Sequence, residues 1–476
     1  MKTDRSYSCS TLPLSTFPNP SPAKPLPLQG ATSERGQAPH SMRLHETRPL
    51  LMRHMIGGLV TCGMALWPNL SFAQAIGSGT SIVISPQLDR DDAAGARVEP
   101  ELVPQPVRAG VFAIQPIVSV VGGYSSNVFN RRDARSDATL FVMPALRVTT
   151  DLAPHRLDFR AGSTIRRFAR YRSENSEEFD LAGEADVEFT NHGLITASAS
   201  VAHLIEPRSS VGTAVDAAEP VSFQRLDGSF GLDLSFGSFR LAPSAGYQRL
   251  TYDPLSLEGG AKVDESFRDT EAARGTVRIS YDFSDLVSGF ASGSVSDIRS
   301  TASAKDVRRD ARSVSALAGL KGALTPLLSG EIAVGYQSRR YELPIYRDFS
   351  GVTFAADLQW YVTPLMTLRL EGDRSFQNSG YREVAGILND RVSLTGYYDP
   401  LRNLRVALSA SYERGQYREV DTRTDRTTLR FNTEYRLGPR LSFGGYLTFI
   451  RQAVHGTPLV SAFTSASAGI GISVTP

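Results

Sequence analysis

Histidine and cysteine are the side chains most often used for metal binding and nucleophilic catalysis, and this 476-residue chain separates its few examples widely. Both cysteines, Cys9 and Cys62, precede Ala75, so a chain that loses this leader has no thiol for a disulfide, a metal or a reaction. The histidines beyond Ala75 are His155, His192, His203 and His455. No nucleophile motif accompanies them, and none has the spacing of a zinc site. The sequence therefore predicts no enzyme, no metal and no cofactor.

Charged residues at every second position indicate a different chemistry, the lining of an aqueous channel. The residues that we expect to line it are Arg156, Arg160, Arg166, Asp180, Glu184, Asp186, Glu188, Arg274, Arg278, Arg369, Glu371, Arg430, Glu434 and Arg436. Apolar or small residues occupy most of the positions between them, so the two kinds of side chain point to opposite faces of a strand. Neighbouring basic and acidic rows can neutralise one another and brace the wall, or they can line a path wetted for sugars or ions.

Arginine supplies nearly all of the positive charge after residue 75, where Lys262, Lys305 and Lys321 are the only lysines. Guanidinium groups form bidentate hydrogen bonds with carboxylates, including those of an acidic polysaccharide. A high arginine content can equally reflect the base composition of a genome.

The elements that carry these rows are strands with one apolar face and one wet face. Residues 179–189 alternate strictly, and residues 273–283 and 429–437 repeat the pattern. Short connections are expected near 151–155, 191–193, 237–238, 284–285, 325–326, 363–365, 399–403 and 438–439. Longer, more charged ones are expected at 125–137, 172–178, 206–220, 253–270, 299–312, 342–348, 377–390, 418–426 and 452–458. Alternating short and long connections predict an all-β, antiparallel transmembrane barrel of about 18 strands, with short periplasmic turns and longer extracellular loops.

A soluble β-propeller or β-sandwich is the alternative, and the aromatic residues argue against it. One set lies on the apolar face just before the short turns: Phe189, Phe236, Phe283, Trp360, Tyr398 and Tyr435. A second set lies near the long loops: Tyr247, Tyr336, Tyr412 and Phe449. Two girdles separated by one strand crossing are typical of a barrel in a bilayer. A bundle of membrane helices is excluded, because no run of 18 apolar residues occurs outside the leader.

The first 110 residues are expected to precede the barrel. Residues 1–75 are interpreted as a leader from a start codon placed too early, followed by a signal peptide with an apolar stretch from Met55 to Trp67. Residues 76–110 are interpreted as a flexible periplasmic segment, and residues 111–476 as the barrel. The chain after residue 75 has 44 Lys and Arg against 46 Asp and Glu, which gives no basic excess for binding nucleic acid.

A short motif adds a family resemblance. Residues 123–129 read Gly-Tyr-Ser-Ser-Asn-Val-Phe. This resembles the aromatic-x-x-Asn-apolar-aromatic signature after the first strand of outer-membrane β-barrel porins that are often found beside exopolysaccharide or capsule genes. The resemblance extends over about residues 112–476, implies a link to polysaccharide export or a porin of another kind, and supplies no catalytic residues.

We therefore expect a passive conduit in the outer membrane of a Gram-negative bacterium. Its expected partners are outer-membrane lipid, the barrel assembly machinery and the components or product of polysaccharide export. A hydrolase embedded in the barrel, built around His203 or His455 at the outer rim, is one alternative. A structural or adhesive barrel is another.

Overall fold

The computed structural model describes residue 82 and residues 88–90, 93–190, 192–210, 217–257, 260–302 and 308–476. The expected leader and signal peptide, residues 1–75, lie outside this part of the chain. Of the expected periplasmic segment, the structure describes Ile82, residues 88–90 and residues 93–110. No helix among the described residues is long and apolar enough to cross a membrane.

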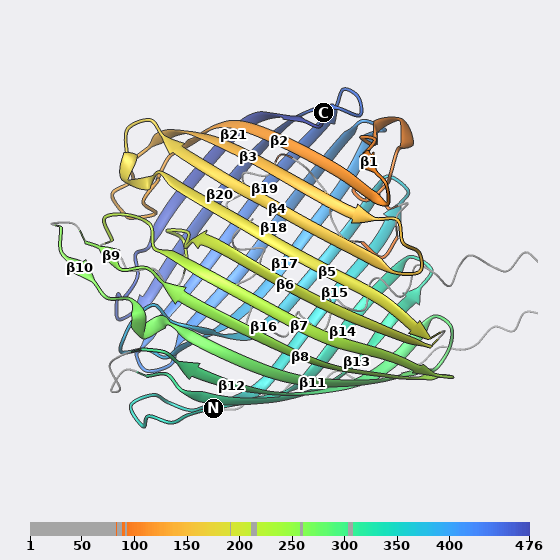
Figure 1. The fold of residues 1–476 in the computed structure, drawn as a ribbon. Coiled ribbons are helices and arrows are strands. Elements are labelled where there is room, and N and C mark those ends of the chain that lie inside the picture. Colours follow the sequence, from red (N-terminus) through yellow and green to blue (C-terminus); the bar gives the residue numbers. More distant parts are fainter. Residues whose placement is uncertain are drawn as a thin grey trace, which may run out of the picture. The chain divides into compact units, whose positions relative to one another are not determined.

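Eighteen antiparallel strands form a closed barrel, as the sequence predicted (Figure 1). Their bounds are β2 Phe112–Ser125, β3 Asp137–Thr150, β4 Arg156–Phe168, β5 Ser176–Thr190, β6 Gly193–Ile205, β7 Ser222–Phe236, β8 Phe239–Tyr252, β11 Thr270–Asp282, β12 Val287–Ser300, β13 Ala311–Thr325, β14 Leu328–Tyr341, β15 Phe349–Thr363, β16 Met366–Asn378, β17 Gly386–Leu401, β18 Leu404–Tyr417, β19 Thr422–Arg436, β20 Leu441–Gly456 and β21 Phe463–Val474. Each strand pairs with its neighbours in sequence, and the barrel closes where β2 pairs with β21.

Three kinds of smaller element are not among these eighteen strands. The short strand β1 (Val107–Ala109) pairs with the start of β2. Strands β9 (Leu255–Ser256) and β10 (Lys262–Val263) form a hairpin in the connection between β8 and β11, at the left in Figure 1. Single 3₁₀ turns occur at Pro100–Leu102, Arg172–Glu174 and Ser266–Arg268.

The strands alternate between a lumen face and an outer face. In β12 the even-numbered residues from Phe290 to Ser300 are buried and the odd-numbered ones are exposed. Both predicted aromatic sets are on the outer face, and every member is at least 38% exposed. Burial is therefore greatest on the lumen side and under the loops, and the large exposed apolar residues form the band that a bilayer would cover.

Two-residue turns connect several strands at one end, which we call the short-turn end. The turn between β7 and β8 consists of Gly237 and Ser238, and Gly237 has a φ of 60°. Glycine adopts this left-handed conformation without strain, and its position fits a tight type II′ hairpin. The opposite end, which we call the long-loop end, carries the longer connections.

Several long connections are shorter than predicted, because the strands extend beyond the apolar band. Strand β5 begins at Ser176, inside the predicted connection 172–178, and β20 continues to Gly456, through most of 452–458. Likewise, β17 begins at Gly386 and β19 at Thr422. Charged residues occupy the outer face of these strand ends, so the alternation of apolar and polar residues stops before the strand does.

Candidate functional site

Asp158 of β4 is the centre of one charged group on the lumen face. Its carboxylate is buried, and three guanidinium groups surround it. Arg147 Nε donates to Oδ2 at 3.0 Å, Arg160 Nε donates to Oδ1 at 3.1 Å, and Arg156 Nη2 lies 3.5 Å from Oδ2. Arg156 and Arg160 lie on the predicted face, but Arg147 was not among the predicted residues. It pairs with Arg160 across β3 and β4, which only the strand register reveals.

The acidic row of β5 also lies on the lumen face. It consists of Asp180, Glu184, Asp186 and Glu188. Across the β4–β5 pair, Arg156 faces Asp186 and Asp158 faces Glu184. Within the described residues, none of these four carboxylates lies within ion-pair distance of a basic side chain, although Arg156 still attracts Asp186 electrostatically. Arg156 and Arg160 contact Asp158 instead, and a strip of unpaired negative charge remains along one side of the lumen.

Two other predicted arginines bind carboxylates that the sequence analysis had not selected. Arg166 Nη2 lies 3.9 Å from Glu178 Oε2. Arg278 forms a bidentate pair with Glu331, with distances of 3.1 and 2.9 Å, and its guanidinium carbon lies 3.6 Å from the centre of the Phe290 ring. Arg278 belongs to β11 and Glu331 to β14, so this pair crosses the lumen face of the two strands between them.

Two more of the predicted arginines, Arg369 and Arg436, also lie on the lumen face. Arg369 donates to Asp357 at 2.9 and 2.7 Å and also lies 3.3 Å from Glu371. Arg436 Nε donates to Glu434 at 2.9 Å. These pairs brace neighbouring positions of the wall.

Arg274 and Arg430 point to the lumen face of β11 and β19, where each is close to another cation. The neighbour of Arg274 is Arg339, and Arg430 is near Arg391. Both sides of the lumen therefore carry charge, with the carboxylate strip on β5 and a cluster of arginines on β17 and β19.

The segment before β1 lies inside the lumen at the short-turn end. Its contacts at this end are with residues on the lumen face of β14, β15, β17 and β18 and with two turns. The Asp89 amide donates to Gln359 Oε1 at 2.7 Å, and Ser329 Oγ donates to Asp89 Oδ2 at 2.8 Å. Arg90 donates to the Pro326 carbonyl at 2.8 Å. This part of the chain therefore crosses the lumen near its short-turn opening.

The same segment also packs tightly against the wall farther along the chain, at Gly95. The Gly95 amide donates to Asp399 Oδ2 at 2.9 Å, and Arg405 donates to the Arg97 carbonyl. Gly95 has a φ of 89°, and a Cβ atom there would lie 2.9 Å from the Tyr397 ring. Only glycine fits both the backbone conformation and the space. The composition of this segment and its lack of periodicity predicted that it precedes the barrel. These contacts could not be derived from either feature.

Ile82 extends the occupied region to the other side of the barrel. It is buried in a cluster with Val121, Phe141 and Tyr446, from β2, β3 and β20. These three residues belong to the lumen face near the seam between β2 and β21. The described residues of the segment thus touch the wall on both sides of the lumen.

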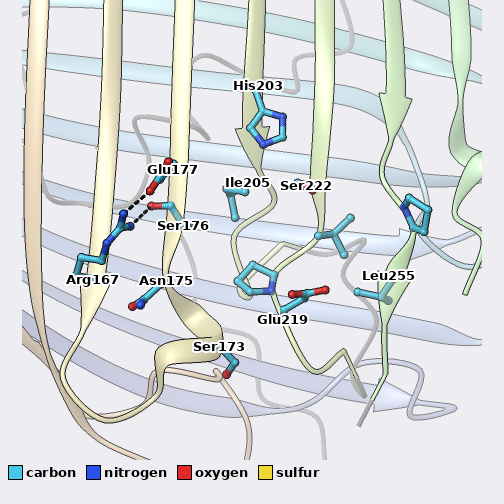
Figure 2. A pocket seen from close by; sticks show the side chains of 13 residues that line it. Arg167, Ser173, Asn175, Ser176, Glu177, His203, Ile205, Glu219, Ser222 and Leu255 are labelled. Carbon is cyan, nitrogen blue, oxygen red and sulfur yellow. Dashed lines mark hydrogen bonds and ion pairs between the residues drawn. The ribbon is translucent and has the colours of Figure 1, made fainter. Parts of the chain in front are cut away.

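The predicted outer-rim histidines lie on the outer face and not in the lumen. His203 stacks on Phe179, with ring centres 5.6 Å apart, and His455 Nε2 lies 3.3 Å from Asp425. A cleft of about 540 Å³ lies beside His203 at the long-loop end (Figure 2). Three serines, Ser173, Ser176 and Ser222, border this cleft. Ser222 Oγ donates to Asp253, and Ser176 Oγ accepts from Arg166.

No hydrogen bond joins any of these three serines to His203 in the described part of the chain. A nucleophile and its base would be joined by such a bond. No group of three His, Cys, Asp or Glu side chains that could hold a metal ion occurs among the described residues.

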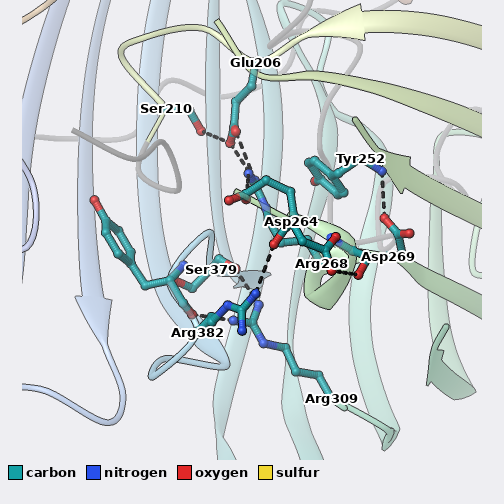
Figure 3. Close-up of polar contacts among 12 residues, drawn as sticks. Glu206, Ser210, Tyr252, Asp264, Arg268, Asp269, Arg309, Ser379 and Arg382 are labelled. Atoms are coloured by element: carbon teal, nitrogen blue, oxygen red, sulfur yellow. Dashed lines mark hydrogen bonds and ion pairs between the residues drawn. The ribbon is translucent and has the colours of Figure 1, made fainter. Parts of the chain in front are cut away.

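Buried arginines join the loops at the long-loop end (Figure 3). Arg268 contacts both Glu206 oxygens at 3.0 Å and lies 3.5 Å from Glu265. Arg309 donates to the carbonyls of Ser379 and Tyr381. Four different connections are linked in this way, and the residues involved were not predicted as a site, because each lies in a segment without periodicity.

A second set of contacts extends this network. Arg382 donates to the Asp264 carbonyl at 3.1 Å, and Tyr381 Oη donates to the Leu459 carbonyl at 2.8 Å. Arg426 of β19 donates to the Ser209 carbonyl in the connection between β6 and β7. Strands β6 and β19 are far apart in the closed barrel order, so this bond reaches across the lumen.

Burial changes the proton affinity of the loop groups. It raises the pKa of Glu265, although Arg268 opposes the rise, and it lowers the pKa of Arg309. The backbone amide and the hydroxyl of Ser266 lower the pKa of Asp264.

The motif at residues 123–129 lies where the barrel closes. Asn127 is buried, and its Nδ2 donates to the carbonyls of Arg131 at 2.7 Å and Thr464 at 3.0 Å. Ser126 exchanges two hydrogen bonds with Ala466, both 2.8 Å long. The motif therefore ties the first long connection to β21 at the seam.

Comparisons with known proteins agree with this fold. Residues 99–475 match the family model described as "Putative beta-barrel porin 2". No curated protein matches the chain. The ferric-catecholate import receptor Fiu of E. coli K12 is similar over 78% of this chain and 82% of its own, at 9% identity and a TM-score of 0.44.

OpdO of Pseudomonas aeruginosa is similar over 76% of this chain and 97% of its own, at 14% identity and a TM-score of 0.40. These two likenesses are too weak to indicate what the barrel transports. The family model, in contrast, spans almost the whole barrel and the segment before it. The protein is thus a porin-like outer-membrane β-barrel, and it belongs to the family described as "Putative beta-barrel porin 2".

Proposed function

We propose that the barrel is a passive conduit for hydrophilic solutes, narrowed at its short-turn end by residues 88–90 and 93–106. The observation that carries this proposal is the lumen face, which holds charged residues along β4, β5, β11, β16 and β19. A barrel of 16 to 18 strands is wide enough to leave an aqueous channel. An ion-paired wall alone would explain Asp158 and its arginines, but it would leave the unpaired acidic row of β5 without a role.

For the cargo we propose a polysaccharide, with the components of its export as partners. The support is the resemblance of residues 123–129 to porins found beside exopolysaccharide genes, together with the lumen arginines. Guanidinium groups that already bind carboxylates on the wall have the geometry to bind those of uronic acids. Direction of transport would then be outward, from the short-turn end to the long-loop end.

Ion selectivity in planar bilayers tests the lumen assignment. Arg160→Gln combined with Arg166→Gln removes two cations opposite the acidic row, so the channel should shift towards cation selectivity. The matched control is Arg167→Gln combined with Arg249→Gln, because these arginines lie on the outer face of β4 and β8. The control should keep the selectivity of the unmodified barrel.

Two results would contradict the proposal. Equal shifts in both double variants would show that the lumen face does not line the ion path. A folded barrel that never conducts, with or without residues 76–106, would favour a structural or adhesive role.

A further inference from the structure

The outer face of the barrel carries charge at one end only. The charged strand residues on this face are Arg167, Glu177, Arg249, Glu271, Asp297, Arg299, Arg312, Arg340, Arg374, Asp390, Arg414, Arg423, Asp425 and Arg451. All of them lie in the part of their strand next to the long loops. The opposite part of the described outer face holds the aromatic set from Phe189 to Tyr435 and no charged strand residue.

We call these charged residues on the outer face the outer belt. Each of its carboxylates forms an ion pair with a neighbouring arginine. Glu177 pairs with Arg167, and Asp390 pairs with Arg374. The other three pairs are Glu271 with Arg249, Asp297 with Arg299, and Asp425 with Arg414 and Arg423. The outer belt contains nine arginines and five carboxylates, so its net charge is positive. The excess charge lies on the arginines that form no ion pair.

Arg312 and Arg340 are two of these remaining arginines, and they are direct cross-strand neighbours on β13 and β14. Both are exposed, and no hydrogen bond or ion pair joins either guanidinium to another residue of the described chain. Asp297, which faces Arg312 from β12, is 3.0 Å from Arg299 instead. Like charges directly opposite one another destabilise a sheet, so an anion bound between the two guanidinium groups would relieve a repulsion within the wall.

The height of the pair matches a lipid headgroup. Arg340 follows the outer-girdle residue Tyr336 by four positions on the same face. A strand tilted by about 40° rises roughly 2.5 Å per residue along the membrane normal, so Arg340 lies about 10 Å beyond Tyr336. Girdle tyrosines mark the edge of the hydrocarbon, and the headgroup layer beyond it is about 5–8 Å thick on each side. A long arginine side chain on a backbone position about 10 Å from the girdle can reach back into this layer.

We propose that Arg312 and Arg340 bind a phosphate of a phosphorylated glycolipid in the outer leaflet. Two adjacent guanidinium groups offer paired donors that match phosphate oxygens, whereas the strongly hydrated lysine ammonium acts as a point charge. The proposal depends on the placement of the barrel in an outer membrane and not on its conduction, because both side chains point away from the lumen. The third unpaired arginine, Arg451 of β20, lacks a neighbouring cation and does not form such a site.

Lipid titration of the purified, refolded full-length barrel tests this site. The probes are diphosphorylated lipid A, dephosphorylated lipid A with the same acyl chains, and inorganic phosphate, each followed by thermal unfolding in detergent. The test variant combines Arg312→Gln with Arg340→Gln. The control combines Arg402→Gln with Arg440→Gln, which removes the same charge from two exposed residues in turns at the short-turn end.

Diphosphorylated lipid A should stabilise the unmodified barrel and the control, and it should bind the test variant about tenfold more weakly or worse. Dephosphorylated lipid A and inorganic phosphate should have little effect on any of them. Without lipid, the test variant should be at least as stable as the unmodified barrel, because a repulsion has been removed. Unchanged conductance would show that the variant is folded.

The proposal is overturned if the test variant binds diphosphorylated lipid A as tightly as the control does. Equal stabilisation by dephosphorylated lipid A would show that the acyl chains, and not the phosphates, are bound. Equal stabilisation by inorganic phosphate would identify a site for free anions. None of these results would affect the conduit, whose test is conductance.

Discussion

The two ends of the lumen are narrowed by different kinds of contact. At the short-turn end, a segment that is not part of the wall lies across the opening and is held largely by backbone groups, such as the Gly95 amide and the Arg97 carbonyl. At the long-loop end, connections of the wall itself are joined by buried arginine side chains, such as Arg268 and Arg309. The first arrangement can be released by moving one segment, but the second requires several loops to separate.

This difference suggests which end controls conduction. The described residues before β1 belong to no strand of the wall and continue into it through β1, so their release leaves every barrel strand pair intact. Opening the loops would instead break several side-chain hydrogen bonds at once and expose buried apolar residues such as Val384 and Ile387, which is costly. We therefore expect the larger changes in conductance from the short-turn end.

Deletion of residues 76–106 should have the largest effect. The deletion removes the contacts of Asp89, Arg90 and Gly95 but leaves β1 in place. Single-channel conductance in planar bilayers should rise roughly severalfold, because an 18-stranded barrel without the segment has an open lumen. An unchanged conductance in a folded variant would show that the segment does not limit the ion path.

Gly95→Val should give a smaller effect of the same kind. The new side chain would meet the Tyr397 ring and would also require an unfavourable φ, which together cost on the order of 1–3 kcal/mol. Trypsin should then cleave faster at Arg90 and Arg97, and open events should become more frequent. The control is Gly110→Ala, at a φ of 60° with no atom within 4 Å of the new Cβ. Equal cleavage in both variants would contradict a tight fit at Gly95.

The strands of the barrel could be predicted from the sequence where one face meets lipid. Apolar residues then occupy every second position, and short turns such as Gly237-Ser238 mark the ends. The prediction failed where strands rise above the lipid, as at Glu177 of β5 and Asp425 of β19, because both faces are wet there. Charge in those positions is typical of loops, although the backbone is still paired.

The face of each lumen residue was predictable, but its partner was not. Alternation placed Arg156 and Arg160 on the lumen side, where they are. Their common partner, Asp158, differs from the acidic row that the sequence suggested. An arginine side chain reaches several positions along and across strands, so its partner depends on register and on competing carboxylates. The contacts of Gly95 and Arg309 join segments far apart in the chain, and no local pattern indicates them.

Arg309→Gln should loosen the long-loop end. Arg309 is buried, and its loss leaves the carbonyls of Ser379 and Tyr381 without their donor, at a cost of about 1–3 kcal/mol. A cysteine introduced at buried Val384, in the same loop, should be labelled by a water-soluble reagent about tenfold faster for each 1.4 kcal/mol lost. Arg308→Gln is the control, because Arg308 is more exposed and donates within its own connection to the Ser300 carbonyl. Equal labelling rates in the two variants would show that Arg309 does not hold the loops together.

The smallest expected effect is the change with pH in how often the loops at the long-loop end open. Burial raises the pKa of Glu265, so the closed loops bind its proton more tightly than open loops do. Lowering the pH from neutral should therefore favour the closed arrangement. The stabilisation grows as the pH falls from the raised pKa of Glu265 to the ordinary glutamate value near 4.3. This stabilisation is lost as the pH rises through the raised pKa. Below about pH 4, protonation of Asp264, whose pKa is lowered, should begin to oppose it.

A cysteine introduced at Ala217 reports this change. Ala217 is buried and bridges Leu257 of the loop that contains Glu265. Its labelling rate, divided by the rate for the unfolded chain at each pH, should fall between pH 7 and pH 5, because the closed loops bind the Glu265 proton more tightly. Glu265→Gln should abolish the dependence, because the amide cannot titrate while Arg268 keeps its contact with Glu206. A dependence that persists in Glu265→Gln would assign the titration to another group.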